Sequence, residues 1–265
     1  MRFVGSWFKK PFMIDQMIRC KNLNPYDTIE TINEWFYKCP PKGKEKQWKD
    51  GRSAKETAMH WVHTIPVAFL DILKDKELVF ELCAPEYVTK FDVYKGEGRN
   101  HDLLILAKNK NKDTVIISIE SKADEPFGDT VEKTIKAAQK KKQINKNSKA
   151  IKRIEDLRKD LFGELNDNQL GLMYQLLTAI AGTIAEAKKQ GAKTAFFLVQ
   201  TFVEKENSKH IKNKKDLNSF LKVFTKSEDA KIENNEVLGP FRITIDNEYL
   251  SSSIDLCIGK YEIKI

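Results

Sequence analysis

The segments Asp102-Leu-Leu-Ile-Leu-Ala-Lys108 and Thr114-Val-Ile-Ile-Ser-Ile-Glu-Ser-Lys122 decide the fold of this sequence. Each is an apolar run of strand length, and the polar stretch 109–113 between them has the length and composition of a hairpin loop. A loop centred on Asn111 places residue 102 opposite residue 120. We therefore expect Asp102 and Glu120 to lie about 5 Å apart across the hairpin, with Lys122 on the face of Glu120.

Two carboxylates and one ammonium group at the end of an apolar hairpin are costly to hold together without a further partner. Packing does not explain them, because Ile117 and Ile119 already supply the apolar core on the opposite face of the second strand. A divalent cation bound between Asp102 and Glu120 would relieve the repulsion of their charges. The hairpin therefore predicts a cation site at its open end.

The elements on either side of the hairpin predict an α/β fold. Ser53 is a good N-cap for a helix that carries Glu56, and apolar runs on both sides of the hairpin are typical of strands. A long, largely buried helix presents a face of small residues around Gly182, with Gln175 as its one long polar group. We expect a central mixed β-sheet flanked by helices. The expected helices are 54–63, 129–145, 151–162 and 168–191, and the expected further strands are 78–82, 87–94 and 195–203.

The spacing of Asp102 and Glu120-Ser121-Lys122 resembles the PD-(D/E)XK signature of the restriction-endonuclease-like nuclease superfamily. The order of elements fits as well, because a helix precedes these strands and a basic helix follows them. One departure is His101 before Asp102, where the signature usually has proline. Residues 28–204 are also similar to an uncharacterised bacterial family within that superfamily. This likeness lies in the segments 48–61, 119–128, 174–177 and 194–202.

The resemblance implies a role for each matching residue. Asp102, Glu120 and the backbone carbonyl of Ser121 would hold Mg²⁺, for which Mn²⁺ can substitute. Lys122 would orient or deprotonate the attacking water, and Gln175 would contact the phosphate or a water on the metal. The implied catalytic set is thus Asp102, Glu120, Lys122 and Gln175, and two further acidic side chains, Glu56 and Glu125, are candidate outer metal ligands.

Charge is concentrated in one part of the chain. The protein carries a formal net charge of +8, and residues 131–160 hold eleven basic side chains against four acidic ones. A surplus of this size favours a polyanionic partner, and double-stranded DNA is the expected one. A solvated lysine-rich surface is the alternative explanation. The expected phosphate-binding residues are Lys133, Lys136, Lys140, Lys141, Lys142, Lys146 and Lys149.

Length and composition are those of a folded globular protein. The 265 residues are 41% hydrophobic and 32% charged, which argues against a disordered or collagen-like chain. The longest apolar stretch, 171–187, is shorter than the ~20 residues of a membrane span, and no signal peptide is evident, so we expect a cytoplasmic protein without a membrane partner. The four cysteines form no CxxC pair, which argues against a zinc site.

We expect three parts along the chain. Residues 1–45 are an aromatic-rich segment packed on the core, residues 46–204 form a restriction-endonuclease-like core, and residues 205–265 add a linker and a β-rich extension. The expected function is that of an Mg²⁺-dependent phosphodiester hydrolase, specifically a DNA endonuclease. A non-catalytic nucleic-acid-binding protein or a scaffold on the same fold is the alternative. A homodimer would suit double-strand cutting, but the sequence does not decide the oligomeric state.

Overall fold

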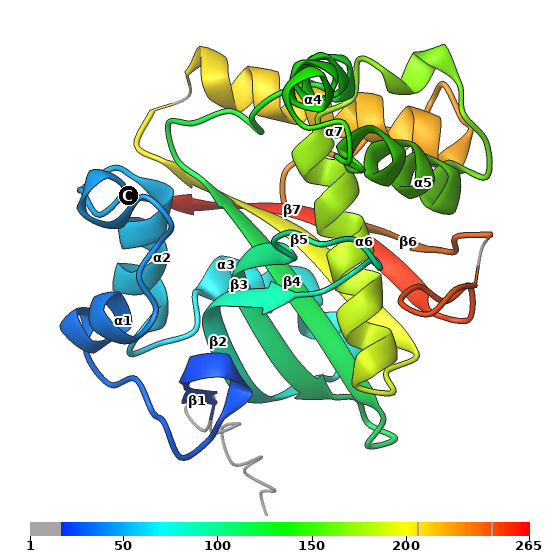
Figure 1. The fold of residues 1–265 in the computed structure, drawn as a ribbon. Helices are drawn as coiled ribbons and strands as arrows, with labels where there is room; N and C mark the ends of the chain where they lie inside the picture. The colour runs from blue at the N-terminus through cyan, green and yellow to red at the C-terminus, as the bar shows by residue number, and fades with distance from the viewer. Residues whose placement is uncertain (1–16, 206, 245) are drawn as a thin grey trace, which may run out of the picture.

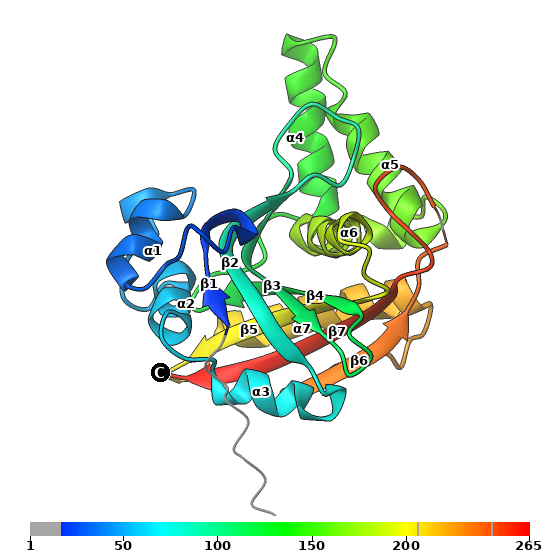
Figure 2. The same ribbon diagram turned by 90° about the horizontal axis from the view of Figure 1, so that it is seen from below.

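A seven-stranded mixed β-sheet forms the centre of the molecule, with helices on both of its faces (Figures 1 and 2). The computed structural model describes residues 17–205, 207–244 and 246–265. Strands β2, β3 and β4 form an antiparallel meander, after which β5 and β7 lie parallel to β4 and β6 lies antiparallel to β7. In spatial order the strands are β1 (Ile18–Arg19), β2 (Val79–Thr89), β3 (Arg99–Lys108), β4 (Thr114–Lys122), β5 (Thr194–Val203), β7 (Asp255–Lys264) and β6 (Glu236–Phe241).

The helices divide into two layers because the strands bury apolar side chains on both faces of the sheet. One core lies under α1, α2 and α3 and includes Ile117 and Ile119 of β4. The other lies under α4 to α7 and includes Leu104 and Ile116. The helices are α1 (Ile32–Lys38), α2 (Ser53–Trp61), α3 (Val67–Leu73), α4 (Val131–Ile144), α5 (Ala150–Phe162), α6 (Tyr174–Lys189) and α7 (Ser208–Thr225).

The β3–β4 hairpin has the predicted register. Its paired residues run from Lys108 opposite Thr114 to Leu103 opposite Ile119, so the pairing is symmetric about Asn111. Asn109 closes the loop, since its side-chain oxygen accepts hydrogen bonds of 2.9 Å from the backbone N–H groups of residues 111 and 113. Strand β4 lies in the middle of the sheet, between β3 and β5.

The alternation of faces along β3 breaks close to Asp102. Leu104 belongs to the core under α6, yet Arg99 and His101 also face that helix. A Cβ atom added to Gly182 of α6 would stand 2.6 Å from the Cβ of Arg99 and 3.1 Å from the Cε1 of His101. Strict alternation would place these two side chains on the opposite face from Leu104. This break brings Arg99 to the same side of the sheet as Glu120.

Two predicted elements begin or end elsewhere in the structure. Strand β2 is a single strand that passes through Pro85, which is tolerated because β1 pairs only with Leu82 and Cys83 and leaves this part of β2 at the sheet edge. Helix α6 begins at Tyr174 rather than residue 168, because residues 167–169 form a separate 3-10 turn. Ser53 is the first residue of α2 instead of its N-cap, and its hydroxyl contacts Glu125.

The part after β5 differs most from the prediction. Residues 208–225, of which the first half was expected to be a linker, form α7; the side chain of Asn207 caps its N-terminus. Leu217, Phe220 and Leu221 bury one face of α7 in the core. Strand β7 is paired with β5 along its whole length, so the C-terminal residues complete the central sheet rather than extend it.

The described part of the N-terminal segment contributes to one of the two cores. Trp35 of α1 is buried in the core under α1 to α3. Residues 1–16, which include Trp7, lie outside the described residues. All four cysteines are free and buried. None of the helices described here has the length and apolar character needed to cross a bilayer.

Candidate active site

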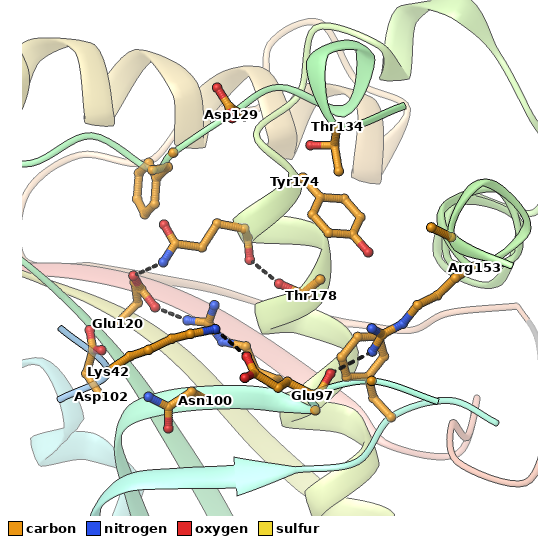
Figure 3. A pocket seen from close by; sticks show the side chains of 18 of the residues that line it. Lys42, Glu97, Asn100, Asp102, Glu120, Asp129, Thr134, Arg153, Tyr174 and Thr178 are labelled. Carbon is orange, nitrogen blue, oxygen red and sulfur yellow. Dashed lines mark hydrogen bonds and ion pairs between the residues drawn. The ribbon is translucent and has the colours of Figure 1, made fainter. Parts of the chain in front are cut away.

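A cavity of about 1730 Å³ opens at the carboxyl end of β4 (Figure 3). Its walls are the segment after α1, the loop between β2 and β3, and the helices α4 and α5. The predicted residues Asp102, Glu120, Lys122, Gln175 and Glu125 all line it. Side chains from two strands, one helix and one loop, up to 73 positions apart, thus meet at one place.

Glu120 is a buried carboxylate of the cavity that accepts three side-chain hydrogen bonds. It is 1% exposed. Its Oε1 accepts hydrogen bonds of 2.6 Å from the Nζ of Lys122 and of 2.6 Å from the Nε2 of Gln175. Its Oε2 accepts from the guanidinium of Arg99. Three donors from β4, α6 and β3 therefore hold one carboxylate, which satisfies its charge without exposure to water.

Lys122 is a buried lysine whose ammonium group is held among acidic and aromatic neighbours. It is 4% exposed, and its Nζ lies 5.2 Å from the ring centroid of Phe127. Burial lowers the pKa of Lys122, Arg99 lowers it further, and the negative charges of Asp102 and Glu125 oppose the shift. A lysine in this setting can lose its proton more readily than an exposed one.

Asp102 joins the ends of the two hairpin strands. Its Oδ2 accepts a hydrogen bond of 2.7 Å from the backbone N–H of Ser121. The side chain of Ser121 is held from the other face of the sheet, since its Oγ accepts from the Nε2 of Gln200 at 3.1 Å and lies 2.8 Å from the Oγ1 of Thr57. The backbone between Glu120 and Lys122 is thereby fixed on both sides.

Glu86 is an acidic residue of the cavity that the sequence analysis missed. The pairs Pro85–Leu103 and Tyr87–His101 place it opposite Asp102, and its φ of 49° lies in the left-handed region. Burial, together with the charge of Asp102, raises the pKa of Glu86 to about 8. The only signal in the sequence was a charged residue after Pro85. Because the sequence analysis expected two separate strands, 78–82 and 87–94, it left Glu86 in the connection between them.

Arg99 and Asn100 were also missed. Arg99 is 8% exposed, lines the cavity, and has its pKa lowered to about 10 by burial. Asn100 donates to the carboxylate of Glu86, while its own Oδ1 is buried and has no hydrogen-bond partner among the described residues. Arg99 is three residues before Asp102, so strict strand alternation places the two side chains on opposite faces of the sheet. For this reason no signal in the sequence indicates that Arg99 belongs to the cavity.

The two candidate outer ligands differ in position. Glu125 lines the cavity, where its carboxylate accepts from the hydroxyl of Ser53 and from the backbone N–H of Asp124. Glu56 is buried in α2, accepts a hydrogen bond of 2.7 Å from the backbone N–H of Gly51, and is not among the residues that line the cavity. The structure therefore gives Glu56 a structural contact in the turn before α2.

Two of the seven predicted basic residues line the cavity, and the other five lie outside its lining. Helix α4 and the start of α5 stand out from the body of the protein (Figure 2). Lys141 and Lys149 line the cavity, and Lys136 forms an ion pair of 2.5 Å with Glu132. All seven predicted lysines are exposed, namely Lys133, Lys136, Lys140, Lys141, Lys142, Lys146 and Lys149.

The oxygen donors of the cavity fit a hard divalent cation. Within residues 17–205, 207–244 and 246–265, no three His, Cys, Asp or Glu side chains gather into a metal-binding group. Mg²⁺ does not require such a group, since it keeps several waters and binds one or two carboxylates. Asp102 and Glu120 supply two carboxylates, and the unpartnered Oδ1 of Asn100 is a further oxygen that a cation or its water would satisfy.

Comparison with known proteins places the chain in a family. No curated protein and no solved structure matches it. One family model, described as a domain of unknown function (DUF6946), matches residues 28–265. The match begins just before α1 and runs through β7, so it includes the whole cavity. This chain therefore belongs to the DUF6946 family.

Proposed function

We propose that this protein is a metal-dependent nuclease, a DNA endonuclease with a restriction-endonuclease-like core. The observation that carries the proposal is the pair of Glu120 and Lys122, which are joined at 2.6 Å beside Asp102 on the floor of a large cavity. The order of α2, β3, β4 and α4 supports it, because the resemblance to the PD-(D/E)XK signature implies this order. The exposed lysines beside the cavity support a polyanionic substrate.

Mg²⁺ would be held by Asp102, Glu120 and the carbonyl of Ser121, with Mn²⁺ as a substitute. Once bound, it would polarise the scissile phosphate and stabilise the charge that develops on its oxygens. The chain itself would hold these ligands in place. Gln200 and Thr57 hold Ser121 from behind, and Asp102 is tied to the backbone of the same residue.

Lys122 would manage the proton of the attacking water. Burial lowers the pKa of Lys122, so Nζ gives up a proton more readily than an exposed lysine does and could then take one from the water, while the nearby carboxylates stabilise the ammonium form. Glu120 orients this amine through its Oε1. Gln175 donates to the same oxygen, so α6 sets the position of the carboxylate relative to the lysine.

The rim of the cavity would bind the phosphates on either side of the cleaved bond. Exposed lysines from three elements, Lys42, Lys95 and Lys141, line the cavity around the acidic floor. Contacts of this kind attract any phosphate backbone and carry no base specificity. We therefore propose that the protein binds DNA of unrelated sequences with similar affinity.

A non-catalytic nucleic-acid-binding protein is the second candidate. One observation favours it: Glu120 already has two cationic partners, Arg99 and Lys122, so its charge needs no metal ion. On this alternative the acidic residues are structural, and the basic rim alone has a function. The two candidates differ in whether divalent cations lead to cleavage.

The test is cleavage of plasmid DNA, with RNA as a second substrate, in Mg²⁺, Mn²⁺ or EDTA. We expect nicking or cutting only with a divalent cation, and a loss of about 100-fold or more in Glu120→Gln and Lys122→Met. The matched controls are Glu262→Gln and Lys260→Met, because that pair is also on one strand, two residues apart and joined at 2.8 Å, but outside the cavity.

The buried ion pairs require a check of folding. Removing one partner of a buried pair destabilises a protein, so both pairs of variants should melt below the parent. The assay is therefore run below the lowest thermal midpoint, with circular dichroism to confirm the folded state. Cleavage that persists in Glu120→Gln and Lys122→Met would refute the site. Binding without cleavage in the parent would favour the second candidate.

A further inference from the structure

Arg99 is a buried side chain of the cavity to which the mechanism above gives no role. Its guanidinium contacts the Oε2 of Glu120. Its Nε is buried and has no hydrogen-bond partner among the described residues. An unpaired N–H on a buried cation is costly, and native structures usually satisfy such a group. The Nε–H of Arg99 is therefore a hydrogen-bond donor that the described part of the protein leaves unused.

The Cβ and Cγ of Arg99 are held in place by packing, whereas its guanidinium can reach more than one partner. Gly182 of α6 leaves no room beyond a hydrogen atom, since an added Cβ would be 2.6 Å from the Cβ and 2.7 Å from the Cγ of Arg99. The Cβ and Cγ of Arg99 are therefore packed tightly against α6. Only the outer torsions of the side chain can move the guanidinium, and they move it within the cavity that Arg99 lines.

Glu120 already has two cationic partners in the described structure, because both Arg99 and Lys122 pair with its carboxylate. A divalent cation on Asp102 and Glu120 would add two positive charges and would compete with Arg99 for the Oε2 of Glu120. The guanidinium would then lie beside an excess of positive charge, where an anion is its best partner.

We propose that Arg99 is a phosphate-binding residue: it pairs with Glu120 in the cation-free protein and turns to the substrate phosphate when a divalent cation takes that carboxylate. This inference rests on the proposed function and adds a residue to it. A guanidinium suits the task because its planar fork donates two parallel N–H bonds to phosphate oxygens. The unpartnered Nε is one of the donors available for such a fork.

The proposal makes two opposite predictions for one residue. Without Arg99, the divalent cation no longer has to displace a guanidinium from the carboxylate of Glu120. The protein should therefore bind the cation more tightly. Phosphate binding in the presence of the cation should become weaker, because the fork is lost. Lysine at this position keeps the charge but offers a single ammonium group, so Arg99→Lys separates the effect of the charge from that of the fork.

The first measurement is calorimetric titration of Mn²⁺ into the full chain without nucleic acid. We expect Arg99→Gln to bind Mn²⁺ about tenfold more tightly than the parent, which is the size of effect that one neighbouring charge has on an ionisable group. Arg99→Lys should remain close to the parent. The matched control is Arg153→Gln, because Arg153 also lines the cavity but pairs with Asp92 instead of Glu120.

The second measurement is fluorescence anisotropy of a labelled DNA duplex in Ca²⁺, with the duplex checked on a gel to be uncut. We expect Arg99→Gln and Arg99→Lys to bind about tenfold more weakly than the parent. Parent-like duplex affinity in Arg99→Lys would overturn the proposal, as would unchanged Mn²⁺ affinity in Arg99→Gln. Thermal midpoints establish that each variant is folded, and Arg99→Lys retains the packed stem if the glutamine variant does not fold.

Failure of this proposal can be told apart from failure of the proposed function. If the parent binds Mn²⁺ and the duplex, shows the expected changes in the Arg99 variants, and does not cleave, then the nuclease function fails and the role of Arg99 stands. If the parent cleaves but the Arg99 variants behave like the parent in both titrations, only the role of Arg99 fails. A parent without Mn²⁺ binding would refute both.

Discussion

Replacing Gly182 with alanine tests the close contact on which the site depends. Gly182 is a buried residue of α6 and lies against Arg99 of β3. An added methyl group would stand 2.6 Å from the Cβ and 2.7 Å from the Cγ of Arg99, whereas two carbon atoms pack best at about 3.5–4.0 Å. The helix and the strand must therefore separate by about 1 Å, because the contact is to the stem of the arginine and not to its flexible end.

The expected loss of stability follows from two opposing effects. Overpacking of this kind costs about 1–3 kcal/mol. Alanine in place of glycine inside a helix stabilises it by about 0.5–1 kcal/mol. The net loss should be about 1–2 kcal/mol, which corresponds to a fall of about 2–4 °C in the thermal midpoint for a domain of this size.

The substitution should also reach the site. Gln175 lies seven residues before Gly182, which is two helical turns along the same face. A shift of α6 would therefore lengthen the 2.6 Å bond from Gln175 to Glu120 and lower the cleavage rate of the proposed nuclease. The stability assay is denaturant-induced and thermal unfolding of the parent and the variant.

Gly171→Ala is the control for this experiment. No atom lies within 4 Å of a Cβ added at Gly171, so alanine should leave the thermal midpoint close to that of the parent. A Gly182→Ala protein as stable as the parent would refute the reasoning, because it would mean that α6 and β3 are not in close contact at this position.

Two further predictions concern charge. Glu86 keeps its proton up to a pKa of about 8 in the folded protein against 4.5 in the unfolded chain, so its contribution to stability is full below pH 4.5 and is lost as the pH rises toward 8. Between about pH 5 and about pH 9, the unfolding free energy of Glu86→Gln should therefore fall less than that of the parent, as measured by denaturant-induced unfolding. The same pH dependence in both proteins would contradict the raised pKa of Glu86. Changing the lysine run 140–142 to alanine should weaken binding to duplexes of unrelated sequence by similar factors and flatten the slope of log K against log salt by up to ~3. A parent-like slope would show that this run is only a solvated face; the control variant changes three exposed lysines outside the cavity, Lys74, Lys76 and Lys112, to alanine.

Short-range patterns in the sequence were enough to predict the hairpin and several of the residues at its end. Apolar runs of strand length around a polar loop determine a register, and the structure has that register from Lys108–Thr114 to Leu103–Ile119. The same kind of local pattern predicted the small face of α6. Gln175 and Gly182 lie on that face in the structure, against Glu120 and Arg99.

Long-range partners could not be predicted in this way. The linker expected after residue 204 is largely helix α7, because burial of Leu217, Phe220 and Leu221 outweighs a sequence rich in lysine and asparagine. The deciding contacts involve neighbours that periodicity alone does not identify.

The sequence by itself thus determined the α/β class and the hairpin register, which brings Asp102, Glu120 and Lys122 together, because hydrogen-bonded ladders are local and repeat at known spacings. Gln175 was added to this group only by the family resemblance. Only the tertiary structure decided that Glu86 and Arg99 belong to the same cavity. Glu86 reaches it because β2 runs as one strand through Pro85 and pairs with β3. Arg99 reaches it through the break in strand alternation beside Asp102, where α6 and β3 are in contact at Gly182. Such a contact is a property of the packed molecule, and no spacing along the chain encodes it.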